Sequence, residues 1–114
     1  MILLLTAKVI VADMGNDTIR KVTSERLVTT FAGSGKDGSA DGQGIAASFN
    51  EPLGLAIDNE GCLFVADAWN HLIRKITSEG LVTTFAGSGE DRSADVCRNH
   101  LIRKIFREVH DDVC

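Results

Sequence analysis

The chain has 114 residues, of which 12 are Lys or Arg and 16 are Asp or Glu, so its formal net charge is −4. This length allows one domain with a small core and excludes a second independent domain. Because net negative charge repels a phosphate backbone, nucleic acid is not expected as a partner. Eleven glycines and one proline in a chain that is 44% hydrophobic are typical of a folded protein with many turns. We expect β structure.

The cysteines and the first residues bear on the compartment. Cys62, Cys97 and Cys114 are odd in number and form no CxxC pair, which favours a reducing, cytoplasmic compartment over a disulfide framework. The opening run MILLLTAKVIVAD is apolar but lacks a basic segment and a cleavage site, and it is too short to span a bilayer. We therefore predict no targeting or transmembrane segment.

A long internal duplication organises the chain. Residues 11–35 (VADMGNDTIRKVTSERLVTTFAGSG) align without gaps to residues 65–89 (VADAWNHLIRKITSEGLVTTFAGSG), with a shift of 54 and 19 of 25 positions identical. The match continues to DGSAD at 37–41 and DRSAD at 91–95. Gly80 in a predicted hairpin turn corresponds to Arg26 in the first copy, and Arg tolerates positive φ less well than Gly. The first unit is therefore predicted to be less ideal.

The linker after the first copy partly matches a calcium-binding loop. Its D-x-S-x-D-G pattern is formed by Asp37, Ser39, Asp41 and Gly42. The twelfth position, however, is Ser48 instead of a bidentate Glu, and no helix precedes the loop. We expect a connection between the two units in which Asp and Ser close local turns, with Asp37 and Asp41 kept only as partial metal candidates.

The second unit contains four strand-like runs separated by turn residues. They are predicted at 53–58, 62–67, 71–77 and 81–86, with the 62–67 strand apolar on both faces and so buried between layers. The segments DNEG and TSEG each place a glycine where a hairpin needs positive φ. Four antiparallel strands in a unit of about 40 residues are the anatomy of a propeller blade.

At these residues the chain resembles the NHL repeat family. The resemblance rests on FNEPLGLAIDNEGCLFVAD, on NHLIRKI with its Asn70, His71 and Leu72, and on VTTFAGSGKDGSADGQG. It implies an all-β fold of propeller blades that act mostly as a binding or scaffold surface. We assign residues 1–95 to a fragment of an NHL propeller. Within it, blade one covers about 1–32 and is incomplete, the linker covers 33–48, and blade two covers 49–89.

Polar and basic residues recur in both copies. Asp13 and Asp67 end the second strand of each unit and Asn16 and Asn70 follow three residues later. We interpret them as capping a tight turn, because turn chemistry must repeat in every blade whereas an active site need not. Each third strand also carries a basic pair, for which a solvated or salt-bridged face is expected rather than an RNA-binding stripe: Arg20 and Lys21, Arg74 and Lys75, and Arg103 and Lys104.

The heptamer NHLIRKI occurs at 70–76 and again at 99–105, only 29 positions later, so 25 residues of the 54-residue period are missing. Residues 96–114 are thus a truncated third repeat. Apolar residues at 101, 102, 105, 106 and 109 share one face of a helix, and we predict a helix over 97–110. A partial zinc-ligand pattern is present at Cys97, His100, His110 and Cys114.

The sequence nominates no catalytic residue and implies no cofactor. The predicted function is a non-catalytic protein-interaction or scaffold module that binds a protein partner, or itself, through open blade edges. Two alternatives remain open at this point. One is a truncated relative of metal-dependent propeller hydrolases or lyases, which would need ligands from several blades, and the other is a gene fragment without a function of its own.

Overall fold

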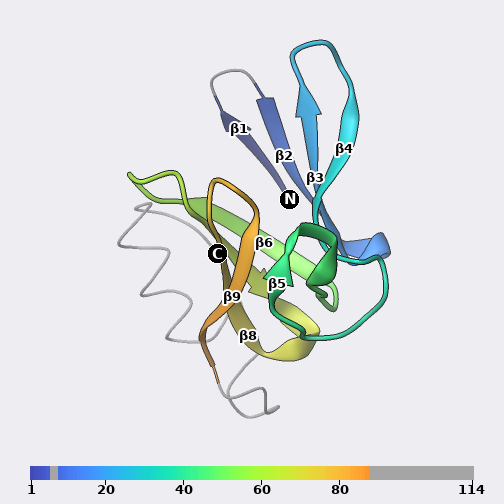
Figure 1. Cartoon of the computed structure of the whole chain (residues 1–114), viewed down its shortest axis with the longest axis vertical. Coiled ribbons are helices and arrows are strands. Elements are labelled where there is room, and N and C mark those ends of the chain that lie inside the picture. The colour runs from blue at the N-terminus through green and yellow to red at the C-terminus, as the bar shows by residue number, and fades with distance from the viewer. Residues whose placement is uncertain (6–7, 88–114) are drawn as a thin grey trace.

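The computed structural model describes residues 1–5 and 8–87, whose strands form two antiparallel sheets (Figure 1). The first sheet has the order β1-β2-β3-β4, with β1 (Ile2–Leu5), β2 (Lys8–Asp13), β3 (Thr18–Thr23) and β4 (Val28–Ala32). The second has the order β5-β9-β8-β7-β6, with β5 (Gly42–Gln43), β6 (Pro52–Ile57), β7 (Leu63–Asp67), β8 (Leu72–Ile76) and β9 (Leu81–Ala86). The predicted all-β fold is confirmed.

The four strands predicted in the second unit are present as β6 to β9, each displaced by no more than one residue at either end. Every residue of β7 is buried, as its apolar sequence predicts. Short 3₁₀ turns follow the second strand of each unit, η1 (Met14–Asn16) and η3 (Ala68–Asn70). The two copies thus fold in the same way.

The first sheet has four strands, which corrects the prediction that the first blade is incomplete. Its additional strand, β1, pairs in register with β2, so that Ile2 lies opposite Val11 and Leu4 opposite Val9. The sequence ILLL is not repeated in the second copy and lacks an alternating pattern, so neither the duplication nor the periodicity identified it as a strand. Pairing with the β2 edge satisfies backbone groups that would otherwise be open.

Both sheets carry the same irregularity beside their arginine. In the first sheet Ile19 pairs with Ala32 and Arg20 with Thr30, so one residue of β4 is skipped. In the second sheet Ile73 pairs with Ala86 and Arg74 with Thr84. This β-bulge places Arg and Thr directly opposite each other in both copies.

The main core lies between the two sheets. Leu55, Val65 and Ile76 of the second sheet are fully buried, and so is Phe49, which directly follows the linker. They pack with residues of the first sheet, namely Ile10, Ala12, Ile19 and Ala32. Because side chains alternate along a strand, Phe64, Ala66 and Ile73 form a smaller cluster on the opposite face of the second sheet.

The linker is part of the second sheet rather than a free connection. Its residues 42–43 form β5, which pairs with Leu81 and Val82 at the edge of β9. The short turn η2 (Gly44–Ala46) follows, and the Gly44 N–H donates to Gly80 O at 2.8 Å. Asp17 of the first sheet accepts a 2.7 Å hydrogen bond from the Glu51 N–H. The linker is thereby fixed to both sheets.

The predicted helix over 97–110 and the truncated third repeat at 96–114 lie outside the described residues. Within residues 1–5 and 8–87 there is no α-helix, and no helical segment there has the length and apolar character to cross a membrane.

Candidate functional site

The recurring Asp, Asn and Arg residues come together on one face of each sheet. Asp67 ends β7, Asn70 lies in η3, and Arg74 comes from the neighbouring strand β8. The η3 turn brings Asn70 back over the end of β7, so its Nδ2 donates to Asp67 Oδ2 at 2.7 Å. The first sheet repeats this contact between Asn16 and Asp13 at 2.9 Å.

In the second sheet the Arg74 side chain is fully buried and holds the linker. Its Nη1 donates to Asp67 Oδ2 at 2.9 Å and to Ser48 O at 2.8 Å. Its Nη2 donates to Ala40 O at 2.8 Å and to Asp41 Oδ1 at 2.9 Å. The guanidinium lies 5.1 Å from the centre of the Phe49 ring, within the range of a cation–π contact. A single side chain thus joins both ends of the linker to the sheet.

The buried Asp67 carboxylate completes this network. Its Oδ1 accepts from the Asn50 N–H at 2.8 Å, while Oδ2 accepts from Asn70 and Arg74. Asn70 Nδ2 also donates to Gly38 O at 2.7 Å. A buried charge pair is tolerated only when further hydrogen bonds replace the lost water, and these contacts meet that condition. We call this set of contacts the linker lock.

The two carboxylates of the linker lock differ in their electrostatics. Burial raises the pKa of Asp67 above its usual value, although Asn50, Asn70 and Arg74 all donate to it. For Asp41, partial burial also acts to raise the pKa, but the hydrogen bonds from Arg74 and Thr84 outweigh it and the pKa is lowered. Asp41 therefore binds Arg74 as an anion at neutral pH.

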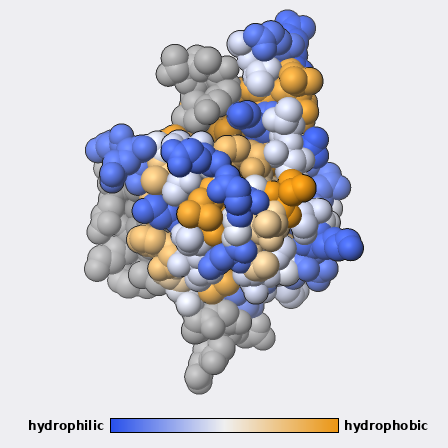
Figure 2. Space-filling view, in the orientation of Figure 1, coloured by the Kyte–Doolittle hydropathy of each residue, from blue (hydrophilic) through white to orange (hydrophobic). Residues whose placement is uncertain are grey.

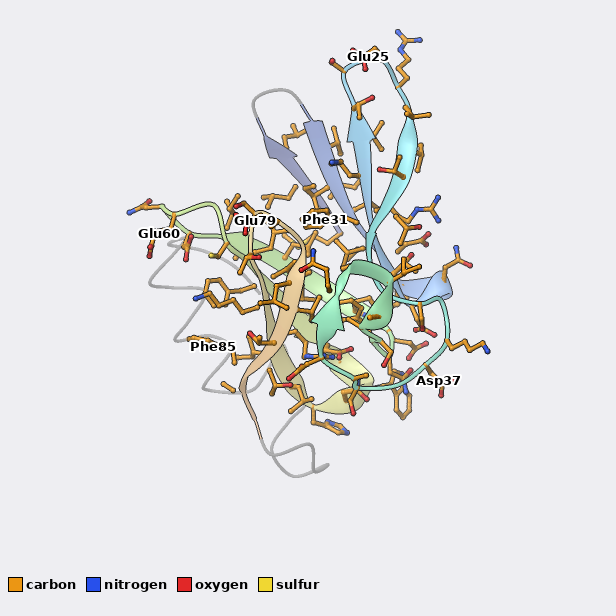
Figure 3. The ribbon with its side chains drawn as sticks, viewed as in Figure 1. Glu25, Phe31, Asp37, Glu60, Glu79 and Phe85 are labelled. Atoms are coloured by element: carbon orange, nitrogen blue, oxygen red, sulfur yellow. The ribbon has the colours of Figure 1, made fainter. Side chains whose placement is uncertain are left out.

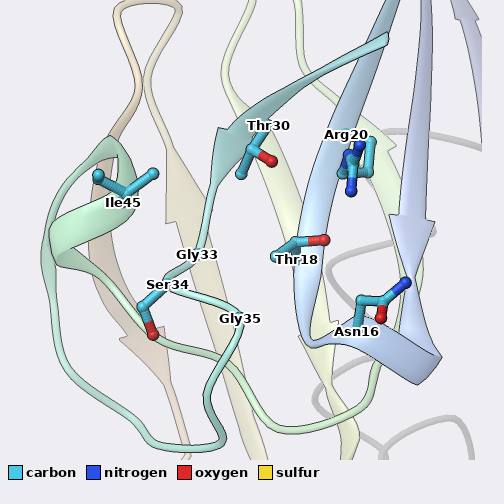
Figure 4. Close-up of a pocket in the computed structure, with 8 residues that line it drawn as sticks. All are labelled: Asn16, Thr18, Arg20, Thr30, Gly33, Ser34, Gly35 and Ile45. Carbon is cyan, nitrogen blue, oxygen red and sulfur yellow. The ribbon is translucent and has the colours of Figure 1, made fainter.

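In the first sheet the corresponding residues line an open cavity together with the first linker residues and Ile45. Arg20 Nη1 lies 3.8 Å from Asp13 Oδ2, and both side chains are 31% exposed. A cavity of about 470 Å³ lies next to Arg20 (Figure 4). Its lining is Asn16, Thr18, Arg20, Thr30, Gly33, Ser34, Gly35 and Ile45. The Thr18 hydroxyl is buried and has no hydrogen-bond partner. We call Asp13, Asn16, Arg20 and Thr30, with this cavity, the open socket.

The predicted turn-capping role of Asp13 and Asp67 is wrong. Neither side chain caps the 3₁₀ turn that follows it. Asp67 instead accepts hydrogen bonds from Asn70, from Arg74 and from the N–H of Asn50, which follows the linker. Asp recurs in both copies because it organises the Asn and Arg beside it.

The basic pairs do not form a stripe, because neighbouring residues of a strand point to opposite faces. Arg74 is salt-bridged, as predicted, but it is buried rather than solvated. Lys75 lies on the other face, 6.0 Å from the centre of the Phe64 ring, and Lys21 lies 5.7 Å from that of Phe31. Arg103 and Lys104 lie outside the described residues.

The partial metal candidates do not converge in the part of the chain that the structure describes. Asp41 is bound to Arg74 and Thr84, while Asp37 is exposed on the linker (Figure 3). No group of three or more His, Cys, Asp or Glu positioned to hold a metal is found among residues 1–5 and 8–87. The Cys97, His100, His110 and Cys114 pattern falls outside them.

The role of Arg74 was missed from the sequence, although one signal was present. An Arg stands seven positions after the Asp in both copies, on the adjacent strand of a predicted hairpin. Its other partners, Ala40 O and Ser48 O, are backbone atoms that no residue type reveals.

Comparison of the sequence with known proteins identifies a family. The model of the teneurin NHL domain matches residues 34–107. NHL repeat-containing protein 2 of Gallus gallus is 40% identical over 83 residues, which cover 72% of this chain and 11% of that protein. The chloroplastic protein SUPPRESSOR OF QUENCHING 1 of Arabidopsis thaliana is 44% identical over 70 residues, covering 60% of this chain and 7% of that protein.

Among solved structures, a Bacteroides thetaiotaomicron protein of unknown function is similar, with a TM-score of 0.65 and 26% identity. The match covers 71% of this chain and 21% of that one. The chain spans about a tenth of the length of the relatives it matches. Because the teneurin NHL model matches more than half of its residues, the chain belongs to the NHL repeat family.

Proposed function

We propose that this chain is a non-catalytic protein-interaction module, a two-blade piece of an NHL propeller that binds protein through the free face of its first sheet. The observation that carries this proposal is the exposed apolar surface of that face. Ile2 is 62%, Leu4 75% and Val28 50% exposed, and all three point away from the second sheet. An apolar sheet face left in contact with water is typical of a binding surface.

The internal duplication supports the same face. By strand register, Ile2 and Leu4 correspond to Leu55 and Ile57 of the second sheet. Leu55 is fully buried against the first sheet, and Ile57 packs at the edge of that core. The covered face of the second sheet supports a binding role for the corresponding face of the first sheet. Figure 2 shows apolar surface beside charged surface over the strands of the first sheet.

The charged groups of the second sheet favour binding over catalysis. Arg74 and Asp67 are fully buried. Arg74 donates its hydrogen bonds to Asp67 and to the linker, so neither side chain is accessible to a substrate. Asp41 is held by Arg74 and Thr84. These residues shape the blade, whereas the apolar side chains of the first sheet remain available for contact.

A photo-crosslinking residue at position 28 tests the proposal. We expect it to capture a defined protein partner, and Leu4→Asp should reduce that adduct at least about tenfold, because a charge on the apolar face opposes burial. A probe at Asn59, on an exposed hairpin of the second sheet, is the control. Equal adducts from both positions, or insensitivity to Leu4→Asp, would contradict an interface on this face.

A further inference from the structure

We infer that the open socket of the first sheet is an aspartate-binding site that takes residues 91–95 of a second copy of this chain. This inference rests on the proposed interaction function and names its partner. It predicts a head-to-tail contact, in which the end of one copy's second repeat docks on the first sheet of the next.

The linker lock is the template for this contact. There Asp41 Oδ1 accepts from Arg74 Nη2 at 2.9 Å and from Thr84 Oγ1 at 3.1 Å. The carbonyl of Ala40 accepts from Arg74 Nη2 and that of Gly38 accepts from Asn70 Nδ2. The only side chain that the segment 38–41 contributes to these contacts is the Asp41 carboxylate.

The first sheet presents the same donors in the same register. Arg20 lies opposite Thr30, as Arg74 lies opposite Thr84, and Asn16 holds the position of Asn70. The cavity of about 470 Å³ lies where the 38–41 segment lies in the second sheet. Thr18, which replaces Leu72, adds a buried hydroxyl without a partner. Among residues 1–5 and 8–87 the donors of this arrangement are in place, and no carboxylate bridges Arg20 and Thr30 as Asp41 bridges Arg74 and Thr84.

The chain carries a second copy of the acceptor. DGSAD at 37–41 recurs as DRSAD at 91–95, which lies outside the described residues. Asp95 corresponds to Asp41 and carries the same carboxylate. The other two acceptors are backbone carbonyls, which a residue of any type at positions 92 and 94 provides. Arg92 replaces Gly38, where an added Cβ would lie 2.6 Å from Ser48 Oγ. The match between the two copies ends at residue 95, so the tail has no counterpart of Ser48 that would impose this restriction.

The repeat topology points to a second copy as the source of this segment. The linker that leaves β4 reaches the next sheet, where β5 pairs with β9 and where Ala40 and Asp41 accept hydrogen bonds from Arg74. Residues 87–95 follow β9 in the sequence as residues 33–41 follow β4, so the repeat assigns them to a following sheet, which a second copy supplies. A contact of this kind joins different surfaces of two copies, and it builds a chain or a closed ring.

Sedimentation of the full chain under reducing conditions tests this contact. We expect concentration-dependent association, which Arg20→Ala and Asp95→Asn each weaken at least about tenfold, because each removes one side of a charge-assisted hydrogen bond. Asp91→Asn is the matched control. It alters the same segment by the same chemistry, but its counterpart Asp37 takes no part in the contacts described above.

Mixing the two variants gives the sharper result. Arg20→Ala keeps an intact tail and Asp95→Asn keeps an intact socket, so we expect the mixture to form a one-to-one dimer that neither forms alone. As an independent check on folding, a synthetic peptide of residues 87–95 should bind the Asp95→Asn chain, and its own Asp95→Asn form should not.

A wild-type monomer at high concentration, a mixture that stays monomeric, or equal weakening by Asp91→Asn would overturn the inference. These results are separable from a failure of the proposed function. If the position 28 probe captures a different protein while the chain stays monomeric, the interaction module stands and the self-docking contact does not. If the open socket instead bound the tail of its own copy, the chain would stay monomeric, and that result would also overturn the inference.

Discussion

The same three residue types have different energetic roles in the two sheets. In the second sheet Asp67 and Arg74 are fully buried and bonded on several sides, whereas Asp13 and Arg20 are partly exposed and 3.8 Å apart. A buried ion pair is costly to break because the remaining charge has lost its water, while an exposed pair contributes little. The same sequence motif therefore allows a buried Asp–Arg pair to be compared with a partly exposed one in a single chain.

Replacing Asp67 tests this difference. We expect Asp67→Ala to lower the free energy of unfolding by about 3 kcal/mol or more, because it leaves Arg74 and the Asn50 N–H buried without their main acceptor. The matched substitution Asp13→Ala should cost about 1 kcal/mol or less. Urea denaturation of both variants measures the difference, and similar losses would contradict the linker lock.

The lowered pKa of Asp41 makes the linker contact pH-dependent. Its ordinary value is 3.8, and Arg74 and Thr84 hold it lower in the folded chain, so the unfolded chain binds the proton more readily. The stabilisation is present above pH 3.8 and is lost as the pH falls through the folded value. The destabilisation caused by Asp41→Asn should therefore be largest near neutral pH and shrink towards pH 3. Thermal melts across this range would show a constant difference if the contact were not ionic.

The β-strands were the most predictable elements, and the linker was the least. Strands β6 to β9 follow from alternating apolar runs between glycine turns. β1 was not expected, because a run of leucines carries no period and its pairing depends on the β2 edge nearby. The linker lock depends on backbone carbonyls and on Arg74 crossing to a segment 26 to 34 residues away, which local patterns do not encode.

The two β-hairpin turns between the third and fourth strands differ at one position. Arg26 has φ 68° and Gly80 has φ 93°, a region that favours glycine. We expect Arg26→Gly to stabilise the chain by about 0.5–1 kcal/mol, because it relieves left-handed strain. Gly80→Arg should destabilise it, since a Cβ there would lie 3.2 Å from Gln43 Nε2. Urea unfolding of both variants is the measurement, and a loss of stability in Arg26→Gly would contradict the strain.

At the scale of the whole molecule, Phe49 connects the two sheets. It is fully buried in the core between them and lies against Arg74. We expect Phe49→Ala to cost about 3–5 kcal/mol and to increase amide exchange in both sheets, for instance at Ile10 and Val65. Trp69→Ala, which removes an exposed aromatic ring, should change stability by less than about 0.5 kcal/mol. Exchange that rises in only one sheet would show that the sheets unfold independently.

The linker lock also gives the chain a direction. The residues that close the second sheet, 38–50, precede that sheet in the sequence. During synthesis from the N-terminus they leave the ribosome before β6 to β9 do, so the second sheet folds onto a segment that is already available. The second blade of this chain is thus completed by residues made just before it.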